Sequence, residues 1–262
     1  MARSATLNVM VQAAMKAGRG LARDFGEVEN LQVSVKGPGD FVSNADRKAE
    51  KVIFESLTKA RPSYGFLGEE GTHLEGDGQH RWIVDPLDGT NNFIHSIPIF
   101  AISIGLESQG QLVAGVVYNP VMNELFTAER GNGAFMNDRR LRVSGRRQLA
   151  DAAVATGVPA LSKTGHAEFI AKQTGLMREV SAVRSCGSAA LNLAWLAAGR
   201  YDAYWESGLK PWDIAAGIVL VREAGGVVTD TEGGSNVLAS SKLLAGNEHM
   251  HGGLKKLLSA NA

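Results

Sequence analysis

Two aspartates, three residues apart, follow a short apolar run. Residues 82–90 read WIVDPLDGT, so Asp85 and Asp88 come just after a strand-like segment. Proline fixes the backbone and glycine permits a tight turn, which allows both carboxylates to converge on one point. Gly89 and Thr90 then offer backbone N–H groups and a hydroxyl at the start of a helical turn, an arrangement that binds anions. The segment predicts acids and an anion site side by side.

Acids beside an anion site imply a cation. Hard divalent ions such as Mg²⁺ prefer carboxylate and carbonyl oxygens, so the Leu87 carbonyl, between the two aspartates, is a further candidate ligand. A second pair of acids, Glu69 and Glu70, follows another apolar run at 65–67. Carboxylates at strand ends are typical of a binding site.

Helices must surround these strands in the first half of the chain. Apolar residues at spacings of three and four predict an amphipathic helix over 7–25. A second helix is expected to begin at Ser43 or Asn44, with Asp46 in its first turn, and to stop before Pro62. Residues 99–143 alternate like strands separated by turns, which predicts an antiparallel meander.

In the second half of the chain, predicted strands alternate with predicted helices. We expect strands near 152–156, 180–183, 201–205, 227–229 and 243–245, and helices near 166–177, 188–198 and 212–224, with a closing helix. Alternating helices and sheets predict an α/β sandwich of several layers.

Three motifs resemble the signature of the inositol monophosphatase family. They are Gly68-Glu69-Glu70, residues 82–93, and residues 211–217, which read PWDIAAG. The resemblance extends along nearly the whole chain. It implies an αβαβα sandwich of the sugar-phosphatase type, formed as a single domain over 1–262. A β-rich half (about 1–150) and an α/β half (about 151–262) would share one cleft.

The same resemblance implies a set of site residues. The implied metal ligands are Glu69, Asp85, the Leu87 carbonyl, Asp88 and Asp213. Gly89 and Thr90 would cradle the phosphate, with Asp213 also facing the substrate. Asp46, Glu69 and Thr90 would form the catalytic group, in which Asp46 pairs with Thr90 and orients a water.

Charge arithmetic supports a multi-metal site. Five acids bring about five negative charges together, and a phosphate monoester adds about two more. Two or three Mg²⁺ ions would balance them and lower the pKa of a water. We therefore expect in-line attack by water without a phosphoenzyme, since the motifs hold no cysteine or histidine nucleophile.

The alcohol side of the substrate is expected at residues 184–190 and at Glu206, which resemble segments that meet an inositol ring. Ala189 would supply a backbone contact, and Glu206 would accept hydroxyl hydrogen bonds. The preferred substrate is inositol 1-phosphate. Histidinol phosphate, fructose bisphosphate and a nucleotide 3′-phosphate are the alternatives, and Lys210-Pro211, a pattern like bacterial members, leaves the choice open.

Composition limits the other functions. The chain has 27 basic and 27 acidic residues and one cysteine, Cys186. Zero net charge argues against a nucleic-acid or membrane partner, and the lone cysteine fits a reducing cytoplasm. No run is apolar enough for a membrane span or a signal peptide.

A second class of function is a partner role. Five arginines surround a short predicted strand and could hold RNA phosphates or an acidic protein, although a solvated hairpin is the simpler interpretation; they are Arg139, Arg140, Arg142, Arg146 and Arg147. By resemblance, some bacterial relatives bind RNA polymerase and Nus factors in ribosomal RNA synthesis. The family also implies lithium inhibition and a homodimer, with residues 191–198 and the β-rich segment after Ile99 as candidate contact regions.

Overall fold

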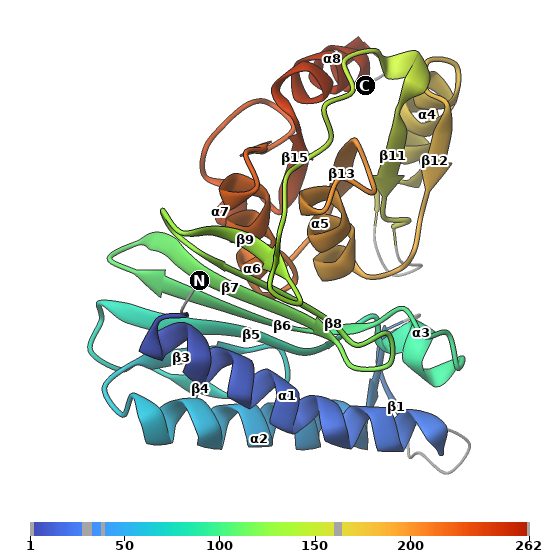
Figure 1. The fold of residues 1–262 in the computed structure, drawn as a ribbon. Coiled ribbons are helices and arrows are strands. Elements are labelled where there is room, and N and C mark those ends of the chain that lie inside the picture. The colour runs from blue at the N-terminus through green and yellow to red at the C-terminus, as the bar shows by residue number, and fades with distance from the viewer. Residues whose placement is uncertain (1–2, 28–32, 38–39, 160–163, 261–262) are drawn as a thin grey trace.

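The computed structural model describes residues 3–27, 33–37, 40–159 and 164–260. A large sheet of eight strands and a small sheet of five lie between three layers of helices (Figure 1). The helices, from the layer below the large sheet to the layer beyond the small one, are α1 (Ala5–Gly26) and α2 (Asn44–Ala60); α5 (Ala189–Ala197), α6 (Pro211–Glu223) and α7 (Val237–Ser240); and α4 (His166–Met177) and α8 (Glu248–Ala260). This order is the predicted αβαβα sandwich, and the prediction is confirmed.

Helices α1 and α2 cover one face of the large sheet. Ser4 caps α1, since its hydroxyl accepts a hydrogen bond from the Leu7 N–H at 3.0 Å. The apolar stripe of α1 is buried as its spacing predicted. Helix α2 begins at Asn44 and ends at Ala60, before Pro62, with Asp46 in its first turn. Both predicted helices are confirmed.

The large sheet has eight strands in the order β10-β9-β8-β7-β6-β5-β3-β4. They are β3 (Gly65–Gly68), β4 (His73–Leu74), β5 (His80–Asp88), β6 (Ala101–Ser108), β7 (Gln111–Asn119), β8 (Glu124–Glu129), β9 (Gly133–Met136) and β10 (Arg139–Arg140). From β5 to β10 neighbouring strands are antiparallel, which confirms the meander. Strands β3 and β5 are parallel, so the loops after both strands lie at one edge of the sheet.

The small sheet has five strands in the order β12-β11-β13-β15-β14. They are β11 (Ala153–Thr156), β12 (Ala182–Arg184), β13 (Ala203–Ser207), β14 (Val227–Thr229) and β15 (Lys242–Gly246). Strand β11 is parallel to both β12 and β13. The predicted strands of the second half are all present, within two residues of their expected positions.

Short elements complete the chain, and the sequence analysis missed most of them. They are β1 (Val33–Gly37), β2 (Asp40–Ser43), α3 (Thr90–Ile94) and a 3₁₀ turn, η2 (Leu149–Asp151). Strands β1 and β2 pair only with each other. Such short pieces carry too little periodicity to be recognised from apolar spacing.

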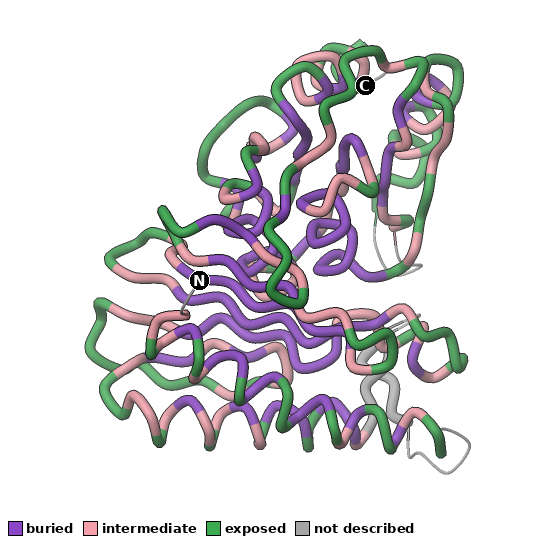
Figure 2. The backbone as a smooth tube through the Cα atoms, in the orientation of Figure 1, coloured by how far each residue is buried: buried purple, intermediate pink, exposed green. Residues whose placement is uncertain are grey.

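Three apolar clusters fill the spaces between the layers, and Figure 2 shows the buried backbone running through the two sheets. Two glycines bring α6 close to the large sheet. A Cβ at Gly115 would lie 2.5 Å from the Ala216 carbonyl oxygen, and one at Gly105 would lie 2.7 Å from the Ala215 Cβ. This close packing brings the start of α6, with Asp213, toward the large sheet. Among the helices of the described residues, none combines the length and the hydropathy that a membrane span requires.

Candidate active site

The two predicted metal-ligand aspartates lie within strand β5. The strand continues to Asp88 instead of ending at Val84, because a bulge between Asp85 and Asp88 lets pairing with β6 resume opposite Ala101. Asp85 is only 2% exposed, and one of its carboxylate oxygens accepts a hydrogen bond from the Leu87 N–H at 2.9 Å. The bulge therefore changes the direction of both carboxylates at the end of β5.

The predicted anion-binding turn follows directly. Gly89 adopts φ 98°, and a Cβ there would lie 2.9 Å from the Ile99 carbonyl oxygen, so only glycine fits without strain. Helix α3 then begins at Thr90. The Thr90 hydroxyl lies 2.9 Å from Asp46 Oδ1 and 3.0 Å from the Leu87 carbonyl oxygen. Asp46, on α2, and Thr90 are thus paired, as the resemblance implied.

Asp88 is held from the second half of the chain. Its Oδ2 accepts hydrogen bonds from the Ser188 hydroxyl and, at 2.7 Å, from the Ala190 N–H. Burial raises the pKa of Asp88 to about 7, and the negative charges of Glu206 and Glu69 add to the increase, while the two hydrogen bonds oppose it. Metal-free Asp88 is accordingly only partly ionised at neutral pH.

Four acidic side chains lie close enough for their charges to interact: those of Glu69, Asp85, Asp88 and Asp213. Burial raises the pKa of Asp85 well above its usual value, and the charges of Glu69, Asp88 and Asp213 raise it further, as does a hydrogen bond with the Glu69 side chain. Glu69 follows β3, and its N–H donates to the Val84 carbonyl at 3.1 Å. Asp213 lies in the first turn of α6 and accepts a hydrogen bond from the Lys210 N–H at 2.7 Å.

This set of donors fits a hard divalent cation. It consists of carboxylates together with the nearby Leu87 carbonyl, and its mutual repulsion calls for positive charge. In the described residues, no three His, Cys, Asp or Glu side chains are arranged as a ready-made metal site. A set of carboxylates with one carbonyl still suits Mg²⁺, because this ion keeps several waters and takes oxygens from a phosphate substrate as further ligands, so the protein does not have to enclose it.

Glu206, the predicted polyol contact, lies on β13 near Asp88. The buried Tyr204 hydroxyl donates to Glu206 Oε2 at 2.5 Å. The carboxyl group also packs on Gly157, where a Cβ would lie 1.9 Å from the carboxyl carbon. Ala189 is the first residue of α5, directly after Ser188, its N-cap. The predicted substrate residues are therefore close to the acids in space.

Cys186 lies half-buried beside this region. Its thiol donates to Asn192 Oδ1 at 2.8 Å. Burial raises the pKa of the thiol to about 12, so it stays protonated at neutral pH. A protonated thiol is a poor nucleophile.

Several supporting residues were missed by the sequence analysis. Ser188 and Tyr204 hold Asp88 and Glu206, and the Asn92 amide donates at 2.7 Å to the carbonyls of Ile99 and Cys186. The signal for Ser188 was its place at the start of the helix predicted near 188–198, where serine is a common N-cap. Asn92 joins segments that are distant in the sequence, and Tyr204 contacts Glu206 on the same face of β13. No local sequence motif reveals either contact.

The arginines near β10 do not form a uniform anion-binding surface. Arg146 forms an ion pair with the buried Asp202 at 3.1 Å. Asp202 also accepts hydrogen bonds from the Ser144 hydroxyl and the Ala153 N–H. At least this arginine therefore joins the hairpin region to the small sheet.

The chain is similar in sequence and structure to known proteins along nearly its whole length. The sequence model of the inositol monophosphatase family matches residues 2–261. The inositol-1-monophosphatase of Mesorhizobium japonicum is 63% identical over 265 residues, covering 99% of this chain and 100% of the relative. The Nus factor SuhB of Escherichia coli is 46% identical over 242 residues, covering 92% and 91%. The crystal structure of the extragenic suppressor protein suhB from Bartonella henselae superimposes with a TM-score of 0.96 at 60% identity, covering 99% and 100%.

Proposed function

Because the chain belongs to the inositol monophosphatase family, we propose that it hydrolyses inositol 1-phosphate to inositol and phosphate with Mg²⁺ as cofactor. As a member of this family it is a phosphoric monoester hydrolase, and the resemblance carried by its three motifs is confirmed. The observation that carries the proposal is the convergence of four acids on the turn where Thr90 pairs with Asp46.

The proposed metal ligands are Glu69, Asp85, the Leu87 carbonyl, Asp88 and Asp213, around two or three Mg²⁺ ions. When bound, the ions would lower the pKa of a water and neutralise the charge of the phosphate. Burial of Asp85 and the raised pKa of Asp88 support this assignment, because a bound cation would favour the ionised form of both carboxylates.

Thr90 and Asp46 would position the attacking water. The Thr90 hydroxyl has one hydrogen, which it donates to Asp46 Oδ1 at 2.9 Å, and its lone pairs remain available to accept a hydrogen bond from water. When the water loses a proton to the Thr90 hydroxyl, Thr90 would pass its own proton to Asp46. The N–H groups of Gly89 and Thr90 would bind phosphate oxygens. The protonated Cys186 thiol supports direct attack by water instead of a cysteine intermediate.

Glu206 would select the alcohol. A carboxylate offers only acceptors, which suits the adjacent hydroxyls of a polyol. Its position is supported by Tyr204 and Gly157, and Ala189 would add a backbone contact. The name of the Mesorhizobium relative favours inositol 1-phosphate over histidinol phosphate, fructose bisphosphate and a nucleotide 3′-phosphate.

Initial rates test the proposal. Phosphate release from the four candidate substrates should be fastest with inositol 1-phosphate, should require Mg²⁺, and should be inhibited by Li⁺. Full activity in EDTA would refute the metal mechanism. Equal rates on all four substrates would refute the proposed role of Glu206 in selection.

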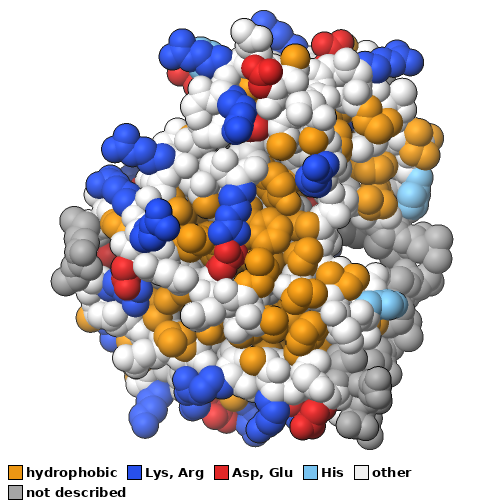
Figure 3. Space-filling model, turned by 45° about the vertical axis from the view of Figure 1, so that its right-hand side comes forward, with side chains coloured by type: hydrophobic (Ala, Val, Ile, Leu, Met, Phe, Trp, Pro, Cys, Tyr) orange, Lys and Arg blue, Asp and Glu red, His pale blue; other side chains and the backbone are white. Residues whose placement is uncertain are grey.

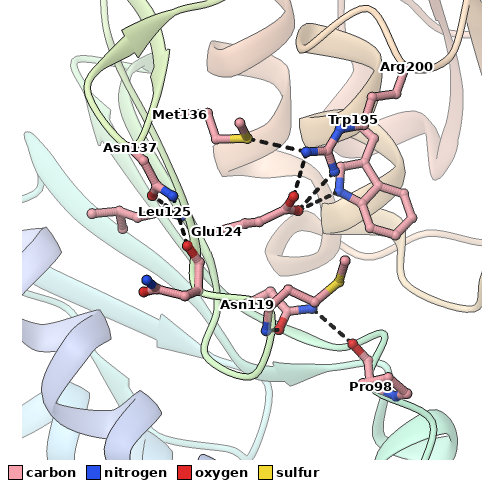
Figure 4. Close-up of polar contacts among 10 residues, drawn as sticks. Pro98, Asn119, Glu124, Leu125, Met136, Asn137, Trp195 and Arg200 are labelled. Atoms are coloured by element: carbon pink, nitrogen blue, oxygen red, sulfur yellow. Dashed lines mark hydrogen bonds and ion pairs between the residues drawn. The ribbon is translucent and has the colours of Figure 1, made fainter.

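We also propose a homodimer, formed through an apolar surface. Figure 3 shows hydrophobic side chains gathered on one face of the molecule. Ile97, Val121 and Met122 are 42%, 39% and 45% exposed, and the Asn119 amide donates to the Pro98 carbonyl at 3.0 Å, which joins their two turns (Figure 4). Exposed apolar patches of this kind mark protein interfaces.

A salt bridge fixes the neighbouring surface. Glu124 accepts a hydrogen bond from the Trp195 indole at 2.9 Å and forms an ion pair with Arg200 (Figure 4).

The prediction that residues 191–198 supply dimer contacts is wrong for most of this helix, because α5 is buried between the two sheets within its own chain.

The double variant Val121→Asp/Met122→Asp should shift the protein from dimer to monomer in light scattering after size-exclusion chromatography. Ile170→Asp, on α4, is the control, because Ile170 is 62% exposed outside this surface. A wild-type monomer would refute the homodimer.

A second candidate function is suggested by the 46% identity to a Nus factor. The chain would then also bind the transcription complex during ribosomal RNA synthesis. A cell carrying only Asp88→Asn separates the two functions. A deletion phenotype rescued by this variant would show that binding matters, whereas failure of rescue by a folded variant would assign the phenotype to catalysis.

A further inference from the structure

Glu50 is a buried acid that belongs to none of the sequence motifs. It lies on α2 and is 2% exposed. Its Oε2 accepts a hydrogen bond from the Glu70 N–H at 2.9 Å, and its Oε1 accepts one from the Thr72 N–H at 3.2 Å and another from the Thr72 hydroxyl. A carboxylate is tolerated at this depth where donors replace water, and all three donors belong to the loop after β3.

That loop carries Glu69. The Glu69 N–H is fixed to the Val84 carbonyl of β5, and the next N–H, that of Glu70, is fixed to Glu50. The Gly68 N–H closes the turn on the Thr72 carbonyl at 2.9 Å. A Cβ at Gly68 would lie 2.3 Å from Glu50 Oε2, so the glycine permits the close approach. The backbone on both sides of the Glu69 side chain is therefore held.

The same helix also holds the other side of the site. Asp46 and Glu50 are four residues apart, so they lie one turn apart on one face of α2. Asp46 contacts Thr90, after β5, and Glu50 contacts the loop after β3. One rigid helix thus fixes the loops that follow two parallel strands.

We propose that Glu50 is a positioning residue that sets Glu69 for metal binding. The inference rests on the proposed role of Glu69 as a ligand. Removing a partner of this kind typically weakens metal affinity 10- to 100-fold, because the ligand must be re-oriented on binding.

Glu50→Gln tests the inference, since Glu70 and Thr72 donate to different oxygens of the carboxylate, and the amide NH₂ group would replace one of these oxygens and face an N–H donor. Calorimetric titration with Mg²⁺ should show binding about 10- to 100-fold weaker than in the wild type. Thr72→Val removes only the hydroxyl donor and should weaken binding by a smaller factor. Glu55→Gln, on the same helix but 56% exposed and paired with Lys51, should change nothing.

Excess Mg²⁺ should restore most of kcat in Glu50→Gln but not in Glu69→Gln, a split that a loss of stability alone would not produce. Wild-type Mg²⁺ affinity in folded Glu50→Gln, with thermal unfolding as the check on folding, would overturn the inference. Should that variant not fold, wild-type affinity in Thr72→Val would overturn it equally. A wild-type protein that binds no Mg²⁺ would instead refute the proposed metal site, and the role of Glu50 with it.

Discussion

The Thr90 hydroxyl offers the sharpest test of the catalytic geometry. Thr90→Val keeps the shape of the side chain and removes the group that contacts Asp46 Oδ1 at 2.9 Å and the Leu87 carbonyl at 3.0 Å. Positioned proton transfer contributes typically about 10²- to 10⁴-fold, so kcat should fall by that factor, which raises the barrier by about 3 to 5 kcal/mol. The lost hydrogen bond should cost only about 1 kcal/mol of folding stability.

The assay is initial phosphate release from inositol 1-phosphate at saturating Mg²⁺, below the unfolding temperature of both proteins. Thr90→Ser is the matched control, because it keeps the hydroxyl, and it should retain kcat within about tenfold. Mg²⁺ affinity should be nearly unchanged in Thr90→Val, since the hydroxyl is not a proposed ligand. A folded, Mg²⁺-saturated Thr90→Val with more than about a tenth of wild-type kcat would refute the assignment of Thr90 and Asp46.

Three further predictions follow from the same site. Asp88→Asn should reduce kcat/KM at least about 100-fold and weaken Mg²⁺ binding in calorimetry, because it removes a charged ligand; unchanged binding would contradict that role. Burial raises the pKa of Asp88 from 3.8 to about 7, so the folded metal-free protein binds an extra proton between these values. In EDTA, the free energy of unfolding of the wild type relative to Asp88→Asn should therefore fall as pH rises from about 4 to about 7 in urea titrations, and a flat difference would show that the shift is absent. Gly89→Ala, which strains φ and meets the Ile99 carbonyl, should cost about 1–3 kcal/mol of stability in the same titration, more than Gly110→Ala, where φ is also positive but nothing lies within 4 Å; equal losses would mean that the contact is unimportant.

Long periodic elements could be predicted from the sequence because local spacing encodes them. The helix at His166–Met177 has the predicted ends, α1 buries its predicted apolar stripe, and α2 begins and ends where expected. The bulge in β5 could not be predicted, since it depends on how Asp85 and Asp88 register against β6. The sequence left open whether α5 would be buried or would form an interface, because an apolar helix suits both positions equally well.

The sequence by itself determined the ingredients of this protein: the acid-rich turn after an apolar run, the two-faced helices and strands that demand layers, and the family they resemble. The tertiary structure decided which acids meet and what holds them. Parallel pairing of β3 and β5 brings Glu69 and Asp85 together. Close packing of α6 on Gly105 and Gly115 places Asp213 near the large sheet. Ser188 donates a hydrogen bond to Asp88, 100 residues away in the sequence. These contacts join distant segments, so no local pattern encodes them. The folded chain also adds contacts from residues outside the motifs, such as the hydrogen bond that Glu50 accepts from the Glu70 N–H, next to Glu69.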